Sequence, residues 1–306
     1  MGKQRRKPFK PPTVQQVRNH LQRNQPRDPS KWALWGPLLL MVIAFVIAAM
    51  WNTAAAWALP WLVVIGTVVF MSMRVRRFRQ LDEQVHRVQE LGLRRNASQS
   101  LRLAWRLLPQ VNELPMLHGR IVAFIAHNLD MLKCYDQALV AYDYLIKRLP
   151  HDHPGAVPIK IHRTMALLAN DQLADADDAL RNLRNVADMF AHSVVGAAYH
   201  MAKLLQLVRT NHFEDAVSMA DNLVEQLRPL GVDAAYGHAL MALSCQKLYD
   251  LKQQGDVGEG LRWWSRATLL IPPGGRVERY PELRDIAAEP GYVDASVRSA
   301  FPGEYA

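Results

Sequence analysis

Few residues of this chain have types and a spacing that could carry out chemistry. The most suggestive group is His151–Asp152–His153, because imidazole and carboxylate side chains are zinc ligands. A zinc site needs three or four ligands and an outer layer of hydrogen bonds that orients them. We therefore interpret this triplet as a hydrophilic loop, and we predict no metal site.

Other catalytic patterns are missing from the sequence. The chain contains two cysteines, Cys134 and Cys245, too far apart for a disulfide framework, which favours a reducing compartment. Gly274–Gly275–Arg276 follows two prolines and lacks the lysine of a phosphate-binding loop. No CxxC or Gly-x-Ser-x-Gly motif occurs. We therefore predict no catalytic residue, no cofactor and no enzymatic activity.

The segment 119–150 is organised as two helices. Apolar residues recur at intervals of three and four in both halves, which is typical of helices with one buried face. Met131–Tyr135 has room only for a turn, and Pro150 ends the second helix because proline lacks the amide donor. The apolar residues are Val122, Ile125, Ala126 and Leu129, then Ala138, Leu139, Tyr142, Leu145 and Ile146.

This helical hairpin resembles a tetratricopeptide repeat, a family with a period of about 34 residues. Ala126 and Ala138 occupy its two small positions, Tyr142 the aromatic position of the second helix and Pro150 the terminal proline. Val122, Ala126 and Leu129 replace the Trp, Gly and first Tyr that are usual in the family. The resemblance implies an architecture and not an activity.

Similar hairpins follow at 157–187, 197–229 and 233–272, and a degenerate one precedes at 74–109. The small residue of the second helix recurs at Ala138, Ala176 and Ala216, with Gly260 in the fifth hairpin. We predict an all-α fold, with a repeat domain at 74–272 built as a solenoid of about five helix–turn–helix repeats. Residues 273–306 are expected to form a cap and tail, with short helices covering the last hairpin.

Residues 32–73 contain no charged side chain. The length suits two membrane-spanning helices, 32–51 and 54–73, joined by a turn at Asn52–Thr53. Tryptophans at both ends, Trp32, Trp35, Trp51, Trp57 and Trp61, fit the two water–lipid interfaces. A cleaved signal peptide ending near Ala54–Ala55–Ala56 and a re-entrant hairpin remain alternatives.

Positive charge flanks this hydrophobic block. Residues 1–31 hold nine Lys or Arg and one acid, whereas 80–306 hold slightly more acids than bases. The positive-inside rule therefore places both termini in the cytoplasm, with Arg74–Arg79 near anionic lipid. Residues 1–31 have few apolar side chains and are predicted to be disordered apart from a short helix at Thr13–Arg23. A third hypothesis, nucleic-acid binding by residues 1–31, is disfavoured because the spans already explain the charge.

The resemblance also implies a partner-binding groove, lined by the first helix of each hairpin. Ala123 and His127 stand where the family's carboxylate-binding Lys and Asn would be, so binding of a chaperone tail is disfavoured. The expected lining residues are Arg120, Ala123, His127, Met131, Ile161, Met165, Leu168, Met201, Leu205 and Arg209.

We predict a scaffold or adaptor anchored in the cell membrane by two spans, which binds a protein partner at the cytoplasmic face. The alternative is a regulatory or assembly subunit of a membrane enzyme or transporter complex. For this alternative, Ala44 and Ala48 supply a small-residue spacing that suits packing against another span.

Overall fold

The computed structural model describes residues 10–27, 31–51, 58–150, 153, 155–190, 192–252 and 256–293. Every regular element in these residues is a helix, and no strand occurs among them, which confirms the all-α prediction. The chain divides into two compact units, residues 1–145 and 146–306. This boundary falls inside the range predicted for a single repeat domain, and each unit is described by itself below.

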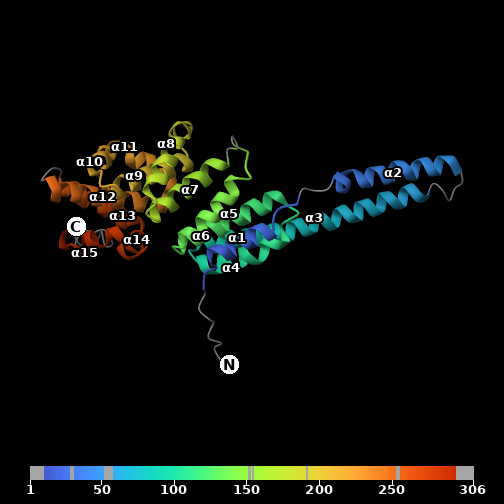
Figure 1. Cartoon of the computed structure of the whole chain (residues 1–306), viewed down its shortest axis with the longest axis horizontal. Helices are drawn as coiled ribbons and strands as arrows, with labels where there is room; N and C mark the ends of the chain where they lie inside the picture. Colours follow the sequence, from blue (N-terminus) through green and yellow to red (C-terminus); the bar gives the residue numbers. More distant parts are fainter. Residues whose placement is uncertain are drawn as a thin grey trace, which may run out of the picture. The chain divides into compact units, whose positions relative to one another are not determined.

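The first unit contains the hydrophobic segment and the first helices of the repeat region (Figure 1). Helix α4 packs against both α3 and α5, and α2 packs against α3. The elements are α1 (Val14–Arg23), α2 (Lys31–Trp51), α3 (Ala58–Leu93), α4 (Ala97–Leu107), η1 (Leu108–Gln110), α5 (Pro115–Met131) and α6 (Tyr135–Ile146).

The second unit is a stack of helices closed by short C-terminal segments. Helices α7, α8 and α9 pack on one another, and α12 packs against α13. The elements are α7 (Ala156–Ala169), α8 (Leu173–Met189), α9 (Val194–Arg209), α10 (Phe213–Ser218), α11 (Ala220–Leu227), η2 (Arg228–Asp233), α12 (Ala234–Lys252), α13 (Val257–Leu270), α14 (Pro273–Arg279), η3 (Pro281–Leu283) and α15 (Arg284–Ala288).

The same turn joins the helices of four successive hairpins. In each turn one residue has a positive φ of 56–60°, and the next amide donates to the carbonyl five residues earlier. This hydrogen bond, seen for example from the Cys134 amide to the Leu129 carbonyl at 2.9 Å, closes the end of the first helix. The positive-φ residues are Arg95, Lys133, Asp171 and Asn211. Their regular spacing along the chain makes the hairpin a structural repeat of 38 to 40 residues.

A small buried residue follows each of these turns by five positions. Ala138, Ala176 and Ala216 occupy it, as expected, and all three side chains are 0% exposed. The first hairpin has Ser100 there, also fully buried, whose hydroxyl donates to the Val88 carbonyl at 2.8 Å. A small side chain at this point lets the two helices of a hairpin approach closely.

The positive φ of the turn residues predicts that a glycine substitution there stabilises the fold. Lys133 has φ 60°, where the Cβ of an L-residue clashes with the backbone, so Lys133→Gly should raise the free energy of unfolding by about 0.5–1 kcal/mol. Arg184→Gly, at an exposed position inside α8, should instead lower it by about 1 kcal/mol. Chemical unfolding of the two variants measures both effects, and a loss of stability in both would contradict the turn geometry.

The structure confirms the short helix predicted at Thr13–Arg23, which is α1, and it corrects the predicted disorder only for the neighbouring residues that it describes, 10–12 and 24–27. Thr13 caps α1, and its hydroxyl and backbone amide both bond with Gln16 in a capping box. Val17 and Leu21 on this helix are 0% and 1% exposed. These two apolar side chains, with the capping bonds and the contacts to α4 and α5 described below, offset the entropy of ordering the segment.

Helix α3 is a single helix of 36 residues, roughly 54 Å long. It begins at Ala58, whereas a span was expected from residue 54, and the predicted turn at Asn52–Thr53 lies outside the described residues. Its C-terminal half buries Leu81, Val85 and Val88 in the first unit. One rigid element thus runs from the hydrophobic segment into the packed helices.

Short C-terminal helices cover the last hairpin of the second unit, as expected for a cap. Helix α14 and η3 pack against α12, and Leu283, Ile286 and Tyr292 are buried. The Tyr292 hydroxyl donates to Gln246 Oε1 at 3.1 Å. These contacts remove apolar surface of α12 and α13 from water.

Candidate functional site

The groove residues expected on α5 lie at or near the surface of the first unit. Ala123, His127 and Met131 are half-buried. Arg120 is exposed, and its Nη1 donates to Asp82 Oδ1 on α3 at 3.1 Å. This ion pair crosses between two helices of the same unit, so Arg120 has a structural contact in addition to any partner.

Four groove residues expected on α7 and α9 lie instead in the core of the second unit. Ile161, Leu168, Met201 and Leu205 are 0–3% exposed. Ile161 packs with Leu180, Leu183 and Ala202, and Met165 is partly buried against this cluster. The physical reason is that α7 and α9 carry apolar residues around most of their circumference. Periodicity alone does not tell which apolar stripe faces a groove and which faces the next helix.

Arg209, the last of the expected groove residues, is held by contacts inside the second unit. Its Nη1 donates to the Leu168 carbonyl and to Asp171 Oδ1, both at 2.8 Å. Its Nη2 lies 3.1 Å from Glu282 Oε1. Arg209 therefore ties the end of α7 and η3 to α9, which is a structural role.

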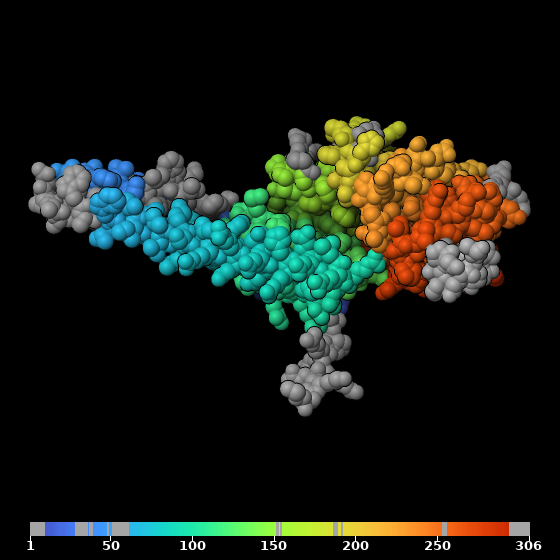
Figure 2. Space-filling view, turned by 180° about the vertical axis from the view of Figure 1, so that it is seen from behind, coloured from blue at the N-terminus to red at the C-terminus, as the bar shows by residue number. Residues whose placement is uncertain are grey.

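An apolar surface covers α2 and the N-terminal half of α3, which lie side by side in the first unit (Figure 1). Ala44 is buried on α2, so this small residue serves the contact inside the hairpin. The start of α3 is uncovered by the packed helices in the face shown in Figure 2. The exposed apolar side chains include Leu39, Leu40, Val42, Phe45, Val46 and Met50 on α2, and Trp61, Leu62, Ile65, Val68, Phe70 and Met73 on α3.

In the part of the chain that the structure describes, no helix combines the length and the hydropathy needed to cross a membrane. The side chains of Trp32, Trp35, Trp51 and Trp57, predicted at the interfaces, lie outside the described residues.

Arginine side chains surround α3 where the apolar surface ends. Arg77 Nη1 lies 3.5 Å from Glu113 Oε2, and the Arg74 guanidinium lies 5.9 Å from the Phe70 ring centroid. A cavity of about 390 Å³ opens beside them, between α3 and the segment 110–114, and apolar side chains such as Val75 and Phe78 line it. The site thus combines positive charge with apolar walls.

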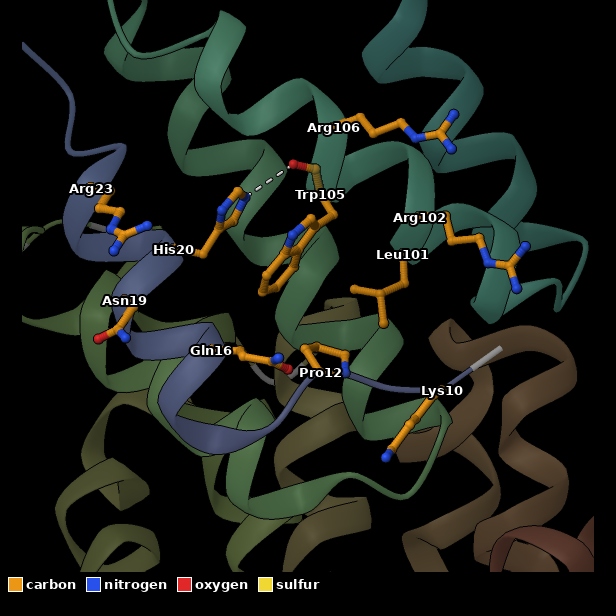
Figure 3. Close-up of a pocket in the computed structure, with 10 residues that line it drawn as sticks. All are labelled: Lys10, Pro12, Gln16, Asn19, His20, Arg23, Leu101, Arg102, Trp105 and Arg106. Carbon is orange, nitrogen blue, oxygen red and sulfur yellow. Dashed lines mark hydrogen bonds between the residues drawn. The ribbon is translucent and has the colours of Figure 1, made fainter. Parts of the chain in front are cut away.

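A second cavity, of about 510 Å³, lies between α1 and α4 and was not predicted from the sequence (Figure 3). Its lining includes four cationic residues, Lys10, Arg23, Arg102 and Arg106, and none of the described lining residues is acidic. The helix that forms one wall, α1, was predicted from the sequence, but its contact with α4 was not.

The histidine beside this cavity is held in its neutral form. The His20 ring stacks on Trp105 with 4.0 Å between centroids and 7° between planes. Its Nε2–H donates to the Trp105 carbonyl at 3.0 Å, and its Nδ1 accepts from the side-chain amide (Nδ2) of Asn24 at 3.3 Å. Burial lowers the pKa of His20, an effect only partly opposed by the bond to Trp105. His20 therefore fixes α1 on α4 through neutral contacts.

A second histidine, on α5, secures the end of α1. His118 Nε2–H donates to the Asn24 carbonyl at 2.8 Å, and the Arg27 amide donates to the Asn112 carbonyl at 2.8 Å. The segment 20–27 is thus bonded to α4, to α5 and to the loop before α5.

The other residues considered for metal binding or nucleophilic chemistry are the loop triplet 151–153 and the two cysteines. Of the loop triplet, only His153 is described, and its Nδ1 accepts from the Gly155 amide at 3.0 Å. No group of three potential metal ligands occurs among the described residues. Burial raises the pKa of Cys134, and it raises that of Cys245 to about 12, so both thiols stay protonated and poorly nucleophilic at neutral pH.

Comparison with protein-family models, with functionally characterised proteins and with solved structures finds no match. The function is therefore argued from the chain's own residues.

Proposed function

We propose that this protein is a membrane-anchored scaffold, in which α2 and the first half of α3 insert into the bilayer and tetratricopeptide-like hairpins bind a protein partner. Both termini face the cytoplasm. The protein works by holding its partner close to the membrane, which raises the effective concentration of the partner there.

The proposal depends on a change along α3, from exposed apolar side chains to arginines and then to side chains buried in the first unit. Its first half exposes large apolar side chains such as Ile65 and Phe70, in a sequence without charge from residue 32 to 73. Arginines follow at 74–79, and the same helix then buries Val85 and Val88. Exposed apolar surface on this scale is unfavourable in water, and lipid is a solvent that removes the cost.

The arginines at 74–79 suit the membrane interface of the proposed anchor. Long cationic side chains extend toward head groups while their stems contact apolar surface. Arg74 and Arg79 line the cavity with Val75 and Phe78, and in the proposed anchor they contact anionic lipid.

The repeated turn supports the tetratricopeptide-like reading of the packed helices. Four hairpins share the same positive-φ turn and the same small buried position, although their period of 38 to 40 residues exceeds the 34 of the family. Accessible groove residues on α5, such as Ala123 and Met131, remain the proposed partner surface in the first unit.

The anchor is tested by carbonate extraction of membranes that contain the full chain. The wild-type chain should stay in the membrane pellet. The double variant Val42→Arg/Ile65→Arg should be largely released, because each arginine near the centre of a span costs about 2.5–3.5 kcal/mol. Leu269→Arg, at an equally exposed apolar residue of α13, is the matched control and should be retained. Release of the wild-type chain would refute the anchor.

The partner surface is tested in the same membranes. A photo-crosslinker placed at Ala123 or Met131 should capture a defined protein, whereas one placed at the exposed Arg184 of α8 should not. Capture at Arg184 alone would place the partner on another surface.

A further inference from the structure

The segment 110–116, which joins η1 to α5, lies beside α3 where the apolar surface of this helix ends. Glu113 Oε2 is 3.5 Å from Arg77 Nη1, and Leu114 lines a cavity of about 390 Å³ together with Met71. These contacts place the segment next to the turns of α3 that end and follow its uncharged block. The segment is thus found at the boundary between the apolar surface and the packed helices of the first unit.

The same segment also contacts the residues that lead into α2. The Arg27 amide donates to the Asn112 carbonyl at 2.8 Å, and α2 begins four residues later, at Lys31. Four residues of chain span at most about 14 Å, so the start of α2 lies within that distance of Arg27. The segment 110–116 is therefore close to both α2 and α3, at the ends of their apolar stretches that adjoin the packed helices.

Met116 is exposed at this boundary. Its side chain is 86% exposed, the largest value among the large apolar side chains that the structure describes, and it follows Pro115 at the start of α5. Farther along α5, Arg120 bonds to Asp82, five residues beyond Arg77 on α3, so α5 runs away from the apolar half of α3. Side chains of a helix lean toward its N-terminus. The Cβ of Met116 is thus directed toward the apolar half of α3.

The face of α3 that turns to this segment is apolar and has positive charge beside it. Its apolar residues recur at intervals of four and three along the helix, so they share one face, and all of them line the cavity. Three arginines also line it, and Glu113 is the only acid among the described lining residues, so the lining has a net positive charge. The apolar residues are Met71, Val75 and Phe78, and the arginines are Arg74, Arg77 and Arg79.

We propose that the segment 110–116 enters the head-group layer of the membrane, where Leu114, Pro115 and Met116 form a second contact with lipid beside the two spans. The partner is the surface of a bilayer that contains anionic phospholipid. This contact rests on the proposed anchor and extends it, because the packed helices themselves then touch the membrane. Contact at the segment as well as at the spans restrains the tilt of the first unit over the bilayer.

The dimensions of the bilayer allow this contact. The head-group layer is about 5–8 Å thick on each side of the hydrocarbon core. Arg79, the last α3 residue of the cavity lining, lies about 9 Å beyond Met73 along the helix. With Met73 at the edge of the core, the cavity and the segment beside it occupy the head-group layer. Lipid then covers apolar side chains that would otherwise face water, and the net positive charge attracts anionic head groups.

The test places an environment-sensitive fluorophore at one position at a time in the full chain, in vesicles of phosphatidylcholine and phosphatidylglycerol that carry nitroxide lipids. Cys134→Ser removes the more accessible native thiol, and Cys245 is buried. A label on Met116→Cys should lose at least about half of its fluorescence to nitroxides at the head group. The same label on Leu93→Cys, which is 77% exposed and about 30 Å beyond Met73 on α3, should keep its fluorescence.

A label on Ile65→Cys separates this contact from the anchor. Nitroxides deep in the acyl chains should quench it, because Ile65 lies in the uncharged block. If the label at position 65 is quenched and the label at position 116 behaves like the one at position 93, the anchor stands and the contact of the segment is refuted. If the label at position 65 is not quenched, the anchor itself fails and the contact of the segment fails with it.

A change of charge tests the contact without changing the labelled residue. Pro115→Asp places a negative charge at the proposed surface, and an acid is favourable at the first position of a helix, so α5 should still form. In the mixed vesicles this charge should shift the balance between contact and no contact by about fivefold, and the quenching at position 116 should fall accordingly. Pro115→Asn is the matched neutral variant and should keep the quenching. Equal quenching at position 116 in the two variants would overturn the proposal.

Discussion

Arg276→Ala is expected to lower the free energy of unfolding by about 3 kcal/mol, the range found when large buried side chains are truncated. Arg276→Met is expected to cost less than about 1 kcal/mol. The difference between the two substitutions separates the packing of this side chain from its charge.

The reason lies in the surroundings of Arg276 on α14. The side chain is 0% exposed, and its guanidinium carbon lies 3.9 Å from the Trp264 ring centroid. Its Nη2 donates to Thr268 Oγ1 at 2.8 Å, but its Nε has no hydrogen-bond acceptor among the described residues. Burial lowers the pKa of Arg276 to about 10, so the group is still charged at neutral pH.

Alanine and methionine remove different parts of this arrangement. Alanine leaves a cavity beside Trp264 and loses the cation–π contact, whereas methionine fills most of the space. Methionine also removes a charge whose burial is unfavourable, and this gain offsets the lost contacts.

Urea unfolding of the detergent-solubilised full chain, followed by tryptophan fluorescence, measures both variants. Arg262→Ala is the control, because Arg262 is exposed on the neighbouring α13 and pairs with Asp256 at the surface, a contact worth less than about 1 kcal/mol. Equal losses for Arg276→Ala and Arg276→Met would show that the charge, and not the volume, stabilises the fold.

The repeated features of the fold could be predicted from the sequence. The apolar periodicity predicted helices where the structure has them. The spacing of Ala138, Ala176 and Ala216 indicated a repeated position, and this position is buried in each hairpin. These features depend on neighbours close in sequence, so the sequence pattern contains them.

Features that depend on contacts between distant segments could not be predicted. The docking of α1 needs Trp105 and His118, which lie about 85 and 94 residues from their partners. The same limit applies to the groove, where burial of Ile161 depends on Leu180, Leu183 and Ala202 from other helices. The composition of residues 1–31 indicated a polar and basic segment. It did not show that two apolar side chains are enough to order the segment when they pack against other helices of the unit.

Acid should destabilise the second unit through one buried histidine, His238 on α12. The side chain is 7% exposed, and neither ring nitrogen has a hydrogen-bond partner among the described residues. Its ring lies 5.5 Å from that of Trp263. Burial, with a smaller contribution from the positive charge of Arg266, lowers the pKa of His238 from 6.5 to about 4.

The sign of the effect follows from where the proton binds. Between pH 6.5 and pH 4 the unfolded chain takes up a proton at this histidine that the folded chain does not, so stability falls as the pH falls. The stabilising contribution is complete above pH 6.5, and about 3 kcal/mol of it is lost by pH 4. Carboxylates also titrate in this range, so the quantity to measure is a difference between variants.

Urea unfolding of the full chain at pH 7 and at pH 4 measures this difference. His238→Phe keeps a planar ring beside Trp263 and cannot bind a proton, so its loss of stability between the two pH values should be smaller than that of the wild type by about 3 kcal/mol. His192→Gln, at an exposed histidine of the same unit, should leave the loss close to the wild-type value. If His238→Phe and the wild type lose the same stability, then the folded state accepts a proton at His238 without opening, and water must reach the ring between α12 and α13.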